Sequence, residues 1–398
     1  MSKRRGPGEG SIFQRGDGRW VASLSLPSVG GKRQRRTVYG ATYEEVRDKA
    51  RDVRKLLDLG VTPSAGLRVD QFLERWLNDT VPGQVSAKTA HEYRRVVRLY
   101  LTPPLGQRRL GRLTIGDCNA TWDGMRQRGL SANTIRYART VLRKALRHAE
   151  IEGLVPRNVA TLSNPPRLGR SEGRSLTAEQ ARAFLEAARG ERLEACYQLM
   201  LAYGLRRGEA LGLTWADLDE EAGTLAVRQG VKREPVAPDP DGSYPGGRHN
   251  RVVISDLKTA RSRRTLYLTP HLVDSLRAHK ARQASERMGL GPGWTDLGLM
   301  FPSCVGTPMD PDNFAGALSK LTTKAGLGHW NPHALRHSGA SLMLAQGTPL
   351  HVVSEVLGHS SISVTANVYA HLFEGQKRDA AEVMTAALFT PRVASLGT

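Results

Sequence analysis

Two stretches of helix-breaking residues most constrain how this chain can fold. Residues 61–66 contain Thr62-Pro63-Ser64, and residues 164–173 are rich in proline, glycine and arginine. Such stretches interrupt helices and strands, so each is predicted to be a linker. At 398 residues the chain is long enough for two or three domains with sizeable cores. The breaks therefore predict three domains, at residues 1–62, 67–164 and 174–398.

The first predicted domain has the pattern of a small sheet followed by a helix. Three strand candidates are separated by glycine-containing turn signals, at residues 11–15, 19–26 and 33–39. Thr42 and Glu45 form a capping box that begins a helix running to about Leu59. The exposed strand positions are basic, which suits either a β-ribbon in a DNA groove or a solvated sheet without groove contact. These positions are Arg15, Arg19, Lys32, Arg33, Arg35 and Arg36.

The second predicted domain has a helical apolar period. Its first stripe consists of Val69, Phe72, Leu73, Trp76 and Leu77. Further helices are predicted at residues 86–101, 114–127 and 131–152, and Pro103-Pro104-Leu105-Gly106 is expected to break the first of them. Their surfaces carry basic side chains, which suit either a clamp on a DNA duplex or a solvated charged face. These side chains include Lys88, Arg94, Arg95, Arg98, Arg136, Arg139, Arg143, Lys144 and Arg147.

The charge of the chain indicates a polyanionic partner. The formal net charge is +20, and the basic residues are interleaved with helical apolar periods, which favours nucleic acid over a ribosomal or membrane surface. Cys118, Cys196 and Cys304 are spaced neither as a disulfide framework nor as a zinc site. No run is long and apolar enough to span a bilayer, and no apolar region follows the basic start of the chain. We therefore expect a soluble, cytoplasmic protein that does not bind membranes.

The third predicted domain is mainly helical, beginning with a capping box at Thr177 and Gln180. A small antiparallel sheet is expected from strand candidates at residues 224–231, 251–254 and 264–268. Residues 235–250, rich in proline, glycine and aspartate, are expected to form a surface loop. The whole chain is thus predicted to be an α+β multidomain protein: a three-stranded sheet plus helix, an all-helical domain, and a mainly helical domain with a small sheet.

A set of polar residues near the C-terminus has the chemistry of a phosphate site. Asn331-Pro332 fits the start of a helix on which His333 and Arg336 lie three residues apart, so both can point at one ligand. His359 follows Gly358, where a second helix should end, and Tyr369 lies on another short helix. A cation, imidazoles and a tyrosine suit a phosphate and a phenolic nucleophile. Taken singly, each of these residues would more often be structural, but the ordered set is much less expected by accident.

Two further pieces complete the set. Arg206 lies between Gly204, where a helix is predicted to end, and Glu209. Arg207 is a neighbouring alternative to Arg206, although the Gly204 and Glu209 frame favours Arg206. Lys258 precedes the strand candidate 264–268, where a hairpin would bring a lysine over a groove.

With these residues, the third domain resembles the tyrosine recombinase (phage integrase) family. The family signature is an arginine in a Gly-x-Arg-x-x-Glu turn, a hairpin lysine, His-x-x-Arg, Leu-Gly-His and a tyrosine. The matching residues here are Arg206, Lys258, His333, Arg336, His359 and Tyr369. Tyr203 stands where many members have threonine. The resemblance extends to a helical core-DNA-binding (SAM-like) domain at 67–164 and to the N-terminal arm-type DNA-binding domain of integrases at 1–62.

The resemblance implies a mechanism. Tyr369 attacks a phosphodiester, which forms a 3′-phosphotyrosyl bond and frees a 5′-hydroxyl, so the bond energy is stored. Arg206 and Arg336 donate to the nonbridging oxygens, and Lys258 protonates the leaving oxygen. His333 is the candidate base for Tyr369, and His359 a hydrogen-bond donor to the phosphate. Glu209 is expected to orient its own turn. No metal or other cofactor is implied, and the sequence contains no Walker-type phosphate loop.

The resemblance also implies partners. These are double-stranded DNA, bound at core and arm sites, and three further copies of the chain in a homo-tetramer that exchanges strands through a Holliday junction. An excisionase or a DNA-bending host protein would be an additional partner. The C-terminal segment 376–389 is apolar enough to dock on a neighbouring protomer or to cap its own domain. The residues expected to contact DNA are Arg19, Arg33, Arg35, Arg36, Lys88, Arg94, Arg139, Arg143 and Lys144.

Within this family we predict the integrase of a phage or integrative element. An Xer-like resolvase of chromosome or plasmid dimers is the alternative, although such resolvases generally lack an arm-binding domain. A metal-dependent transposase would need converging carboxylates, and the densest acidic cluster, Asp217, Asp219, Glu220 and Glu221, fits a solvated turn better. A DNA-binding regulator without chemistry would have no use for Tyr369 together with both arginines.

Overall fold

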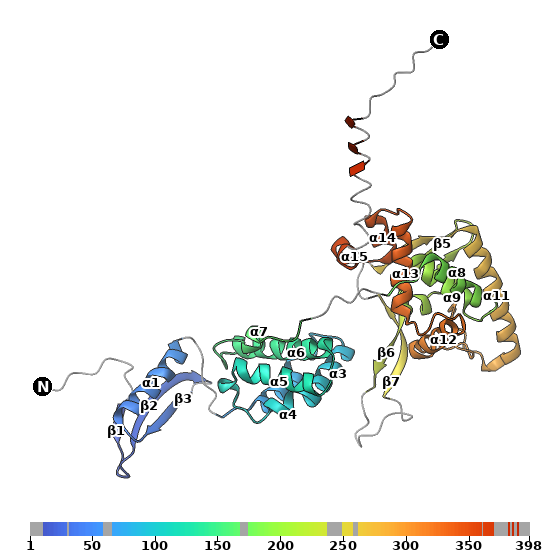
Figure 1. The fold of residues 1–398 in the computed structure, drawn as a ribbon. Helices are drawn as coiled ribbons and strands as arrows, with labels where there is room; N and C mark the ends of the chain where they lie inside the picture. The colour runs from blue at the N-terminus through green and yellow to red at the C-terminus, as the bar shows by residue number, and fades with distance from the viewer. Residues whose placement is uncertain are drawn as a thin grey trace. The chain divides into compact units, whose positions relative to one another are not determined.

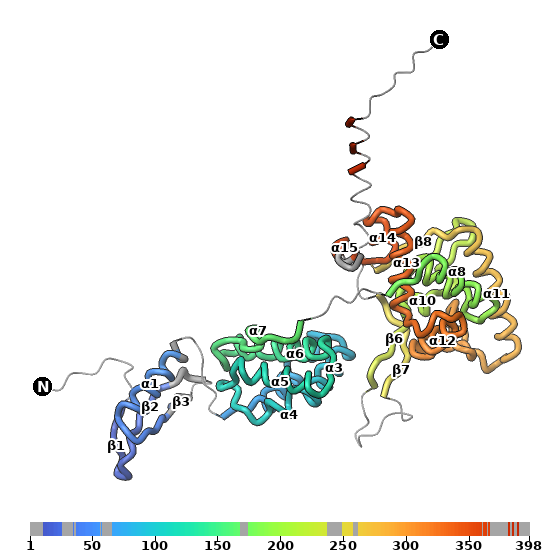
Figure 2. The backbone as a smooth tube through the Cα atoms, viewed as in Figure 1, coloured from blue at the N-terminus to red at the C-terminus, as the bar shows by residue number. Residues whose placement is uncertain are grey.

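The computed structural model describes most of the chain (Figures 1 and 2). The described residues are 11–29, 32–58, 66–167, 174–236, 249–257, 262–359, 361–369, 381–382, 384–385 and 388–389. They fall into two compact units, 1–170 and 171–398. Within the first unit, the N-terminal sheet and the following helices have separate apolar clusters. The α+β class predicted from the sequence is confirmed, whereas the division into three domains stays a prediction.

The N-terminal part is a three-stranded antiparallel sheet covered by one helix, as predicted. The strands are β1 (Ser11–Gln14), β2 (Trp20–Val29) and β3 (Lys32–Gly40), in the order β1-β2-β3. Helix α1 (Tyr43–Asp58) begins where the Glu45 backbone N–H donates to Thr42 Oγ1 at 3.2 Å. The small core of this part consists of Ala22, Leu24, Val46, Ala50 and Val53.

The following helices form one bundle around a large apolar core. They are α2 (Val69–Arg75), α3 (Ala87–Val96), α4 (Thr102–Leu105), α5 (Ile115–Gln127), α6 (Ala132–Ile151) and α7 (Val159–Leu162). Helix α6 is its longest element, and its predicted apolar face is buried throughout. That face consists of Ile135, Ala138, Val141, Leu142, Ala145, Leu146 and Ala149.

The helix predicted at residues 86–101 continues past Leu101, although it does end within the predicted break at Pro103-Pro104-Leu105-Gly106. Helix α3 continues into a π-helical turn, Val97–Leu101, and α4 follows directly with its prolines in its first turn. The first turn of a helix tolerates proline because its N–H groups have no intrahelical partner there. The chain therefore stays helical up to Gly106, which caps α4.

The second unit is mainly helical and has two small sheets. Its helices are α8 (Ala178–Ala187), α9 (Glu194–Tyr203), α10 (Arg207–Leu211), α11 (Pro270–Leu290), α12 (Pro311–Lys324), α13 (Pro332–Ala345), α14 (Leu350–Leu357) and α15 (Ile362–Tyr369). One sheet consists of β4 (Leu218–Asp219), β5 (Thr224–Val227) and β8 (Arg264–Tyr267), in the order β4-β5-β8. The other is the hairpin of β6 (Gln229–Pro235) and β7 (Asn250–Asp256).

The single strand predicted at 224–231 is therefore two strands in different sheets. Strand β6 leaves the β5 sheet and runs against α10, where glycines allow the two backbones to approach closely. A Cβ atom on Gly212 would lie 2.6 Å from the Cα of Gly230, and one on Gly208 would lie 2.6 Å from Val231 O. The chain therefore leaves the sheet of β5 in order to pack β6 against α10. The alternation of apolar residues over 224–231 did not predict this change of partner.

Helix α9 is at the centre of this unit and positions the site. Its residues Cys196, Leu199 and Met200 are fully buried, and α13 packs against it. Gly339 on α13 faces the Leu201 carbonyl of α9 so closely that no Cβ would fit between them. Helices α13 and α14 and strand β8 lie close together in this unit (Figure 2). None of the described helices is long and apolar enough to cross a membrane.

Candidate active site

Helix α13 begins as predicted and carries two of the candidate residues. The Asn331 side chain accepts a hydrogen bond from the Ala334 backbone N–H at 2.9 Å, and Pro332 follows in the first turn. His333 is exposed near this end, whereas Arg336, one turn further on, is only 3% exposed. The two side chains thus differ sharply in their surroundings, although they lie three residues apart on one helix.

The guanidinium of Arg336 lies between the ends of two helices. Its Nη1 donates to the Gly204 carbonyl at 2.7 Å, and its Nη2 donates to the Leu357 carbonyl at 2.8 Å. Gly204 caps α9 and Gly358 caps α14, both with positive φ. Helix C-terminal carbonyls lack intrahelical partners and carry the negative end of the helix dipole, so they stabilise a buried cation. Arg336 is thereby held in one orientation.

Arg206 occupies the turn between α9 and α10. Its Nη1 donates to Glu209 Oε1 at 2.6 Å, and its backbone N–H donates to Glu209 Oε2 at 3.1 Å. Glu209 is 3% exposed, whereas the Arg206 side chain is 42% exposed. The guanidinium is thus fixed from behind by a buried carboxylate while part of it faces solvent. The neighbouring Arg207 binds the Pro311 carbonyl at the start of α12 instead, at 2.7 Å.

Three arginines meet at the C-terminal turn of α14. Three successive carbonyl oxygens of this turn each accept a hydrogen bond from a different guanidinium. The pairs are Val356 O with Arg264 Nε at 2.6 Å, Leu357 O with Arg336 Nη2 at 2.8 Å, and Gly358 O with Arg206 Nη2 at 3.3 Å. The helix end thus orients several cations before any anion is bound, and it brings Arg206 and Arg336 to the same short segment of chain.

His359 follows directly after this turn, as predicted. Its backbone N–H donates to the Ser354 carbonyl at 3.0 Å, which closes the end of the helix. Its Nδ1 lies 2.7 Å from the hydroxyl of Thr365, a fully buried residue of α15. Burial, and then the charges of Arg336 and Arg206, lower the pKa of His359 to about 4. The imidazole is therefore neutral near pH 7.

His333 is paired with a second histidine that the sequence analysis did not single out. Its ring centroid lies 4.6 Å from that of His337, with the rings nearly perpendicular. Partial burial, and then the charge of Arg336, lower the pKa of His333 below its ordinary value. Burial, and then His333, act in the same direction on the pKa of His337. A neutral imidazole can accept a proton, which a protonated one cannot.

Of two candidate residues, the structure describes only the backbone of one and no part of the other. Tyr369 is the last residue of α15, one helical turn after Thr365, and its side chain lies outside the described residues. Lys258 lies outside the described part of the chain altogether, as does most of the predicted loop 235–250. The strand β8 that follows Lys258 begins at Arg264.

Arg264 and Thr365 contact the candidate residues, but the sequence analysis missed both. A signal for Arg264 was available: Arg264, Leu266 and Leu268 alternate along a strand, and the two leucines are buried. The period of two places the arginine on the buried face, where a charge needs a partner. Thr365 offered no comparable signal, because a single threonine in a short apolar helix is ordinary.

The acidic cluster does not converge on a site. Asp217 accepts a hydrogen bond from the Thr214 hydroxyl at 2.6 Å, and Asp219 accepts from two backbone N–H groups of its own turn. Glu220 pairs with Arg277 and Lys280 of α11. Within the described ranges, no group of three His, Cys, Asp or Glu residues could hold a metal ion. Asp217 and Asp219 thus stabilise a turn, as predicted, but the Asp217 side chain is only 8% exposed and is not solvated.

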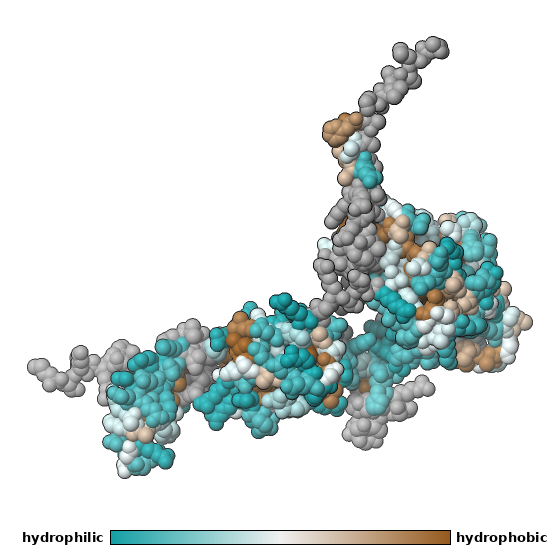
Figure 3. Space-filling model, in the orientation of Figure 1, coloured by the Kyte–Doolittle hydropathy of each residue, from teal (hydrophilic) through white to brown (hydrophobic). Residues whose placement is uncertain are grey.

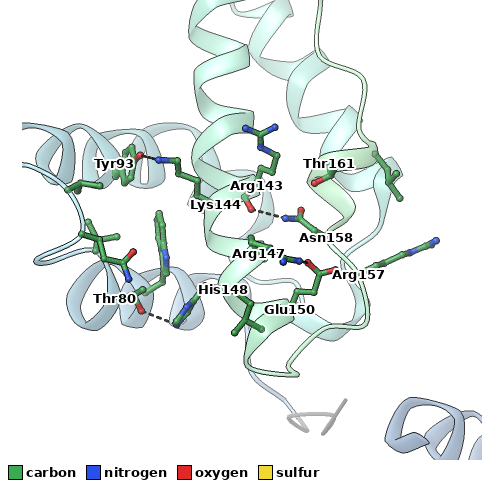
Figure 4. Close-up of a pocket in the computed structure, with 16 residues that line it drawn as sticks. Thr80, Tyr93, Arg143, Lys144, Arg147, His148, Glu150, Arg157, Asn158 and Thr161 are labelled. Atoms are coloured by element: carbon green, nitrogen blue, oxygen red, sulfur yellow. Dashed lines mark hydrogen bonds and ion pairs between the residues drawn. The ribbon is translucent and has the colours of Figure 1, made fainter. Parts of the chain in front are cut away.

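The helical part of the first unit has a cavity lined by several basic side chains (Figure 4). The cavity measures about 750 Å³, and Arg143, Lys144 and Arg147 of α6 line it. Lys144 Nζ donates to the Tyr93 hydroxyl at 2.8 Å. The surface of this part is mainly hydrophilic in the view of Figure 3.

The other predicted DNA contacts differ in their availability. Lys88 is exposed, but Arg139 donates to the Ala160 and Thr161 carbonyls of α7, and Arg94 donates to Asn78 and to the Leu77 carbonyl. These two arginines therefore stabilise the bundle in the structure as it stands. On the N-terminal sheet Arg19 and Arg35 are exposed, whereas the side chains of Arg33 and Arg36 are not described.

Comparisons with known proteins agree on a family. Residues 174–376 match the model of the phage integrase family. An integrase of Streptomyces ambofaciens is 31% identical over 380 residues, which cover 93% of this chain and 94% of the relative. A tyrosine recombinase XerC-like protein of Caldanaerobacter subterraneus is 28% identical, over 89% of this chain and 92% of the relative.

Solved structures share the fold. The Tn1549 transposon integrase in complex with transposon right end DNA has a TM-score of 0.65 and 22% identity, covering 81% of this chain and 99% of that one. A lambda integrase tetramer bound to a Holliday junction has a TM-score of 0.54 and 17% identity, covering 92% and 96%.

Proposed function

Because the chain belongs to the phage integrase family, and is thereby a tyrosine-type site-specific recombinase, we propose that it integrates a mobile genetic element into DNA and also excises it. The element would be a phage or an integrative element. The observation that carries this proposal is the basic N-terminal sheet, which stands ahead of the helical bundle and the matched family region. An integrase uses such a domain for arm-type sites, which dimer resolution does not require.

The family resemblance assigns a role to each candidate residue, and the lowered pKa of His333 supports one of these roles. Tyr369 attacks the scissile phosphate through its phenolic oxygen, while His333, neutral because its pKa is lowered, accepts the phenolic proton. The bond from phosphorus to the 5′-oxygen breaks, and Lys258 donates the proton that this oxygen takes up. The products are a 3′-phosphotyrosyl bond and a free 5′-hydroxyl, so the reaction consumes no high-energy cofactor.

Arg206 and Arg336 stabilise the charge that develops on the nonbridging oxygens. Both guanidiniums are oriented by hydrogen bonds to helix-end carbonyls, so they need little reorganisation when the phosphate arrives. Each preorganised donor of this type is worth about 3 kcal/mol in the transition state. His359, neutral near pH 7, would add a hydrogen bond to the same phosphate.

DNA would be bound by the two parts of the first unit. The helical bundle at 67–164, with Lys88, Arg143 and Lys144, would hold the core site through its phosphates. The N-terminal domain at 1–62, with Arg19 and Arg35, would bind arm-type sites. Four copies would assemble on two core sites, as the lambda integrase tetramer does on a Holliday junction. An excisionase or bending protein stays a prediction.

Recombination of the gene's own flanking DNA tests this proposal. The chain is expressed beside its flanks in a heterologous host, and the junctions are amplified and sequenced. We expect joined element ends and an empty target site, both lost in Tyr369→Phe. Deleting residues 1–62 should abolish these products while leaving core-site cleavage intact.

An Xer-like resolvase is the second candidate, favoured by the XerC-like relative that covers nearly the whole chain. This reading predicts that plasmid dimers carrying a single site are resolved to monomers, with no excised circle from the flanks. It also predicts that the deletion of residues 1–62 leaves resolution unaffected. Excised circles that depend on residues 1–62 would exclude it.

A further inference from the structure

Arg264 is a buried cation that the mechanism above does not use. It lies at the start of β8, and its side chain is 8% exposed. All three nitrogens of its guanidinium have partners: Nε donates to Val356 O at 2.6 Å, Nη1 to Ser262 O at 3.0 Å, and Nη2 to Glu209 Oε2 at 2.9 Å. Three of its five N–H groups are thus engaged by the protein in a buried position, and two of its partners belong to the candidate site.

The first of these partners is the carboxylate that holds Arg206. Glu209 Oε1 accepts from Arg206 Nη1, while Oε2 accepts from Arg264 Nη2 and from the Arg206 backbone N–H. Burial acts to raise the pKa of Glu209, but the charges of Arg264 and then Arg206 hold it below its ordinary value. Arg264 thus keeps a buried carboxylate charged, and that carboxylate orients Arg206.

The second partner is the end of α14. Arg264 donates to Val356 O, and the next two carbonyls accept from Arg336 and Arg206. A shift of this turn would change the orientation of both guanidiniums and would move His359, which follows it. Arg264 therefore connects β8, α10 and α14 at the point where the phosphate-binding groups are assembled.

We propose that Arg264 is a positioning residue for cleavage: it fixes the Glu209 carboxylate and the C-terminal turn of α14, and through them it sets the orientation of Arg206. This role rests on the proposed function of Arg206 as a phosphate ligand. In this proposal Arg264 acts through Glu209 and α14, to which its guanidinium is bound, and not on the phosphate directly.

The proposal predicts a pH effect that loss of packing alone would not produce. Without Arg264, the buried Glu209 keeps Arg206 as its one ion-pair partner among the described residues, and the pKa of Glu209 rises. Orientation of Arg206 needs the carboxylate, so cleavage is retained above the raised pKa and lost as the pH falls through it. The charged groups that act on Glu209 are Arg206 from its own turn and Arg264 from β8. His333 titrates near these arginines and sets the acid side of the native profile, whereas His359, with a pKa of about 4, stays neutral between pH 5 and pH 9.

The experiment is single-turnover cleavage of a nicked core-site duplex by the full chain between pH 5 and pH 9, with DNA affinity measured in parallel. For Arg264→Gln we expect cleavage at least tenfold slower at pH 7, affinity within twofold of native, and an acid limb displaced to higher pH. Arg264→Lys keeps a charge beside Glu209 but cannot reach all three partners. It should restore the native pH profile while remaining slower than native.

Two further variants separate the proposal from its rivals. Arg263→Gln is the matched control, because Arg263 is the neighbouring arginine, is 58% exposed and pairs only with Asp256 among the ion pairs of the described chain. It should cleave at the native rate. The double variant Glu209→Gln with Arg264→Gln should lose the displaced limb, since the carboxylate that titrates is gone.

Native rate and profile in Arg264→Gln would overturn the proposal, as would a displaced limb that persists in the double variant. If Arg264→Gln does not fold, a native rate in a folded Arg264→Lys would overturn it equally. A native chain that binds the duplex yet never cleaves any core site would contradict the proposed function itself, which is a different result from a defect confined to the Arg264 variants.

Discussion

Arg206 and Arg207 are adjacent in the sequence, but their side chains bind different parts of the protein. Each can therefore serve as a control for the other. Arg206 is held by Glu209 and Gly358 at the candidate site, whereas Arg207 binds Pro311 and Asp312 on α12. The sequence favoured Arg206 through the frame of Gly204 and Glu209. The structure separates the two side chains in space, because it places the Arg206 guanidinium at α14 and the Arg207 guanidinium at α12.

For Arg206→Lys we predict cleavage slower by about 10²- to 10³-fold, the usual cost of losing one preorganised donor. Lysine keeps the charge but cannot donate to Glu209, Gly358 and a phosphate in fixed directions. The measurement is single-turnover adduct formation on a nicked duplex. Arg207→Lys should stay within a few-fold of native, and the reverse ranking would transfer the role to Arg207.

His333 should set the acid side of the native pH profile. Its pKa is lowered from 6.5 by partial burial and by Arg336. A base must be unprotonated, so the cleavage rate should be constant above pH 6.5 and fall as the pH drops through the lowered pKa. His359, with a pKa of about 4, is neutral over this range and adds no second step. The profile of His333→Gln should be lower and flat; an unchanged acid limb in that variant would exclude His333 as the base.

At the scale of elements, the site depends on how closely α9 and α13 pack. Gly339 of α13 lies against the Leu201 carbonyl of α9, and the Gly204 carbonyl at the end of α9 binds Arg336 of α13. Because Gly339 has no side chain, α13 packs closely enough on α9 for Arg336 of α13 to donate to the Gly204 carbonyl of α9. The helix pattern of the sequence predicted both helices but not this contact.

For Gly339→Ala we predict a loss of unfolding free energy of about 1–3 kcal/mol, since the added methyl group meets backbone rather than a movable side chain. Cleavage should fall as well, because separating α9 from α13 displaces Gly204 from Arg336. Denaturant titration and single-turnover cleavage measure the two effects. Gly316→Ala on α12 is the control, as open space surrounds that position and alanine favours a helix. Equal behaviour of both variants would contradict the packing argument.

What the sequence could predict follows from the range of the interactions involved. Helix caps are local, so the positions of Asn331, Gly358 and His359 were predicted correctly from neighbouring residues. The hydrogen bond from Arg264 to Val356 joins residues 92 apart. No local pattern contains such a contact. The division of 224–231 into two strands depends on Gly208 and Gly212 of another element in the same way.

At the scale of the whole molecule, the formal net charge of +20 is spread over parts in which the basic side chains have different surroundings. Exposed arginines lie on the N-terminal sheet, a basic cavity lies in the helical bundle, and the buried arginines of the second unit orient one another around Glu209 and α14. A net charge predicts a polyanionic partner, but it cannot distinguish arginines that bind DNA from arginines that build the site.

The C-terminal segment 376–389 should act between protomers. Of its described residues, Met384 and Leu388 are 56% and 65% exposed, which leaves apolar surface to be covered. We predict that deleting the segment leaves core-site DNA binding intact and abolishes recombination. Gel-shift and recombination assays on the same preparation measure both. Unchanged recombination would end the idea, and loss of binding together with loss of solubility would show instead that the segment caps its own domain.

The most direct test of the account is a covalent adduct between the chain and DNA. Nicked duplexes taken from the DNA flanking the gene are incubated with the native chain and with Tyr369→Phe, and the products are separated on a denaturing gel. We predict an adduct of the chain with the 3′-phosphate end in the native protein and none in Tyr369→Phe, with equal DNA binding by both. An adduct that persists in Tyr369→Phe would move the nucleophile elsewhere and contradict the assignment of the site.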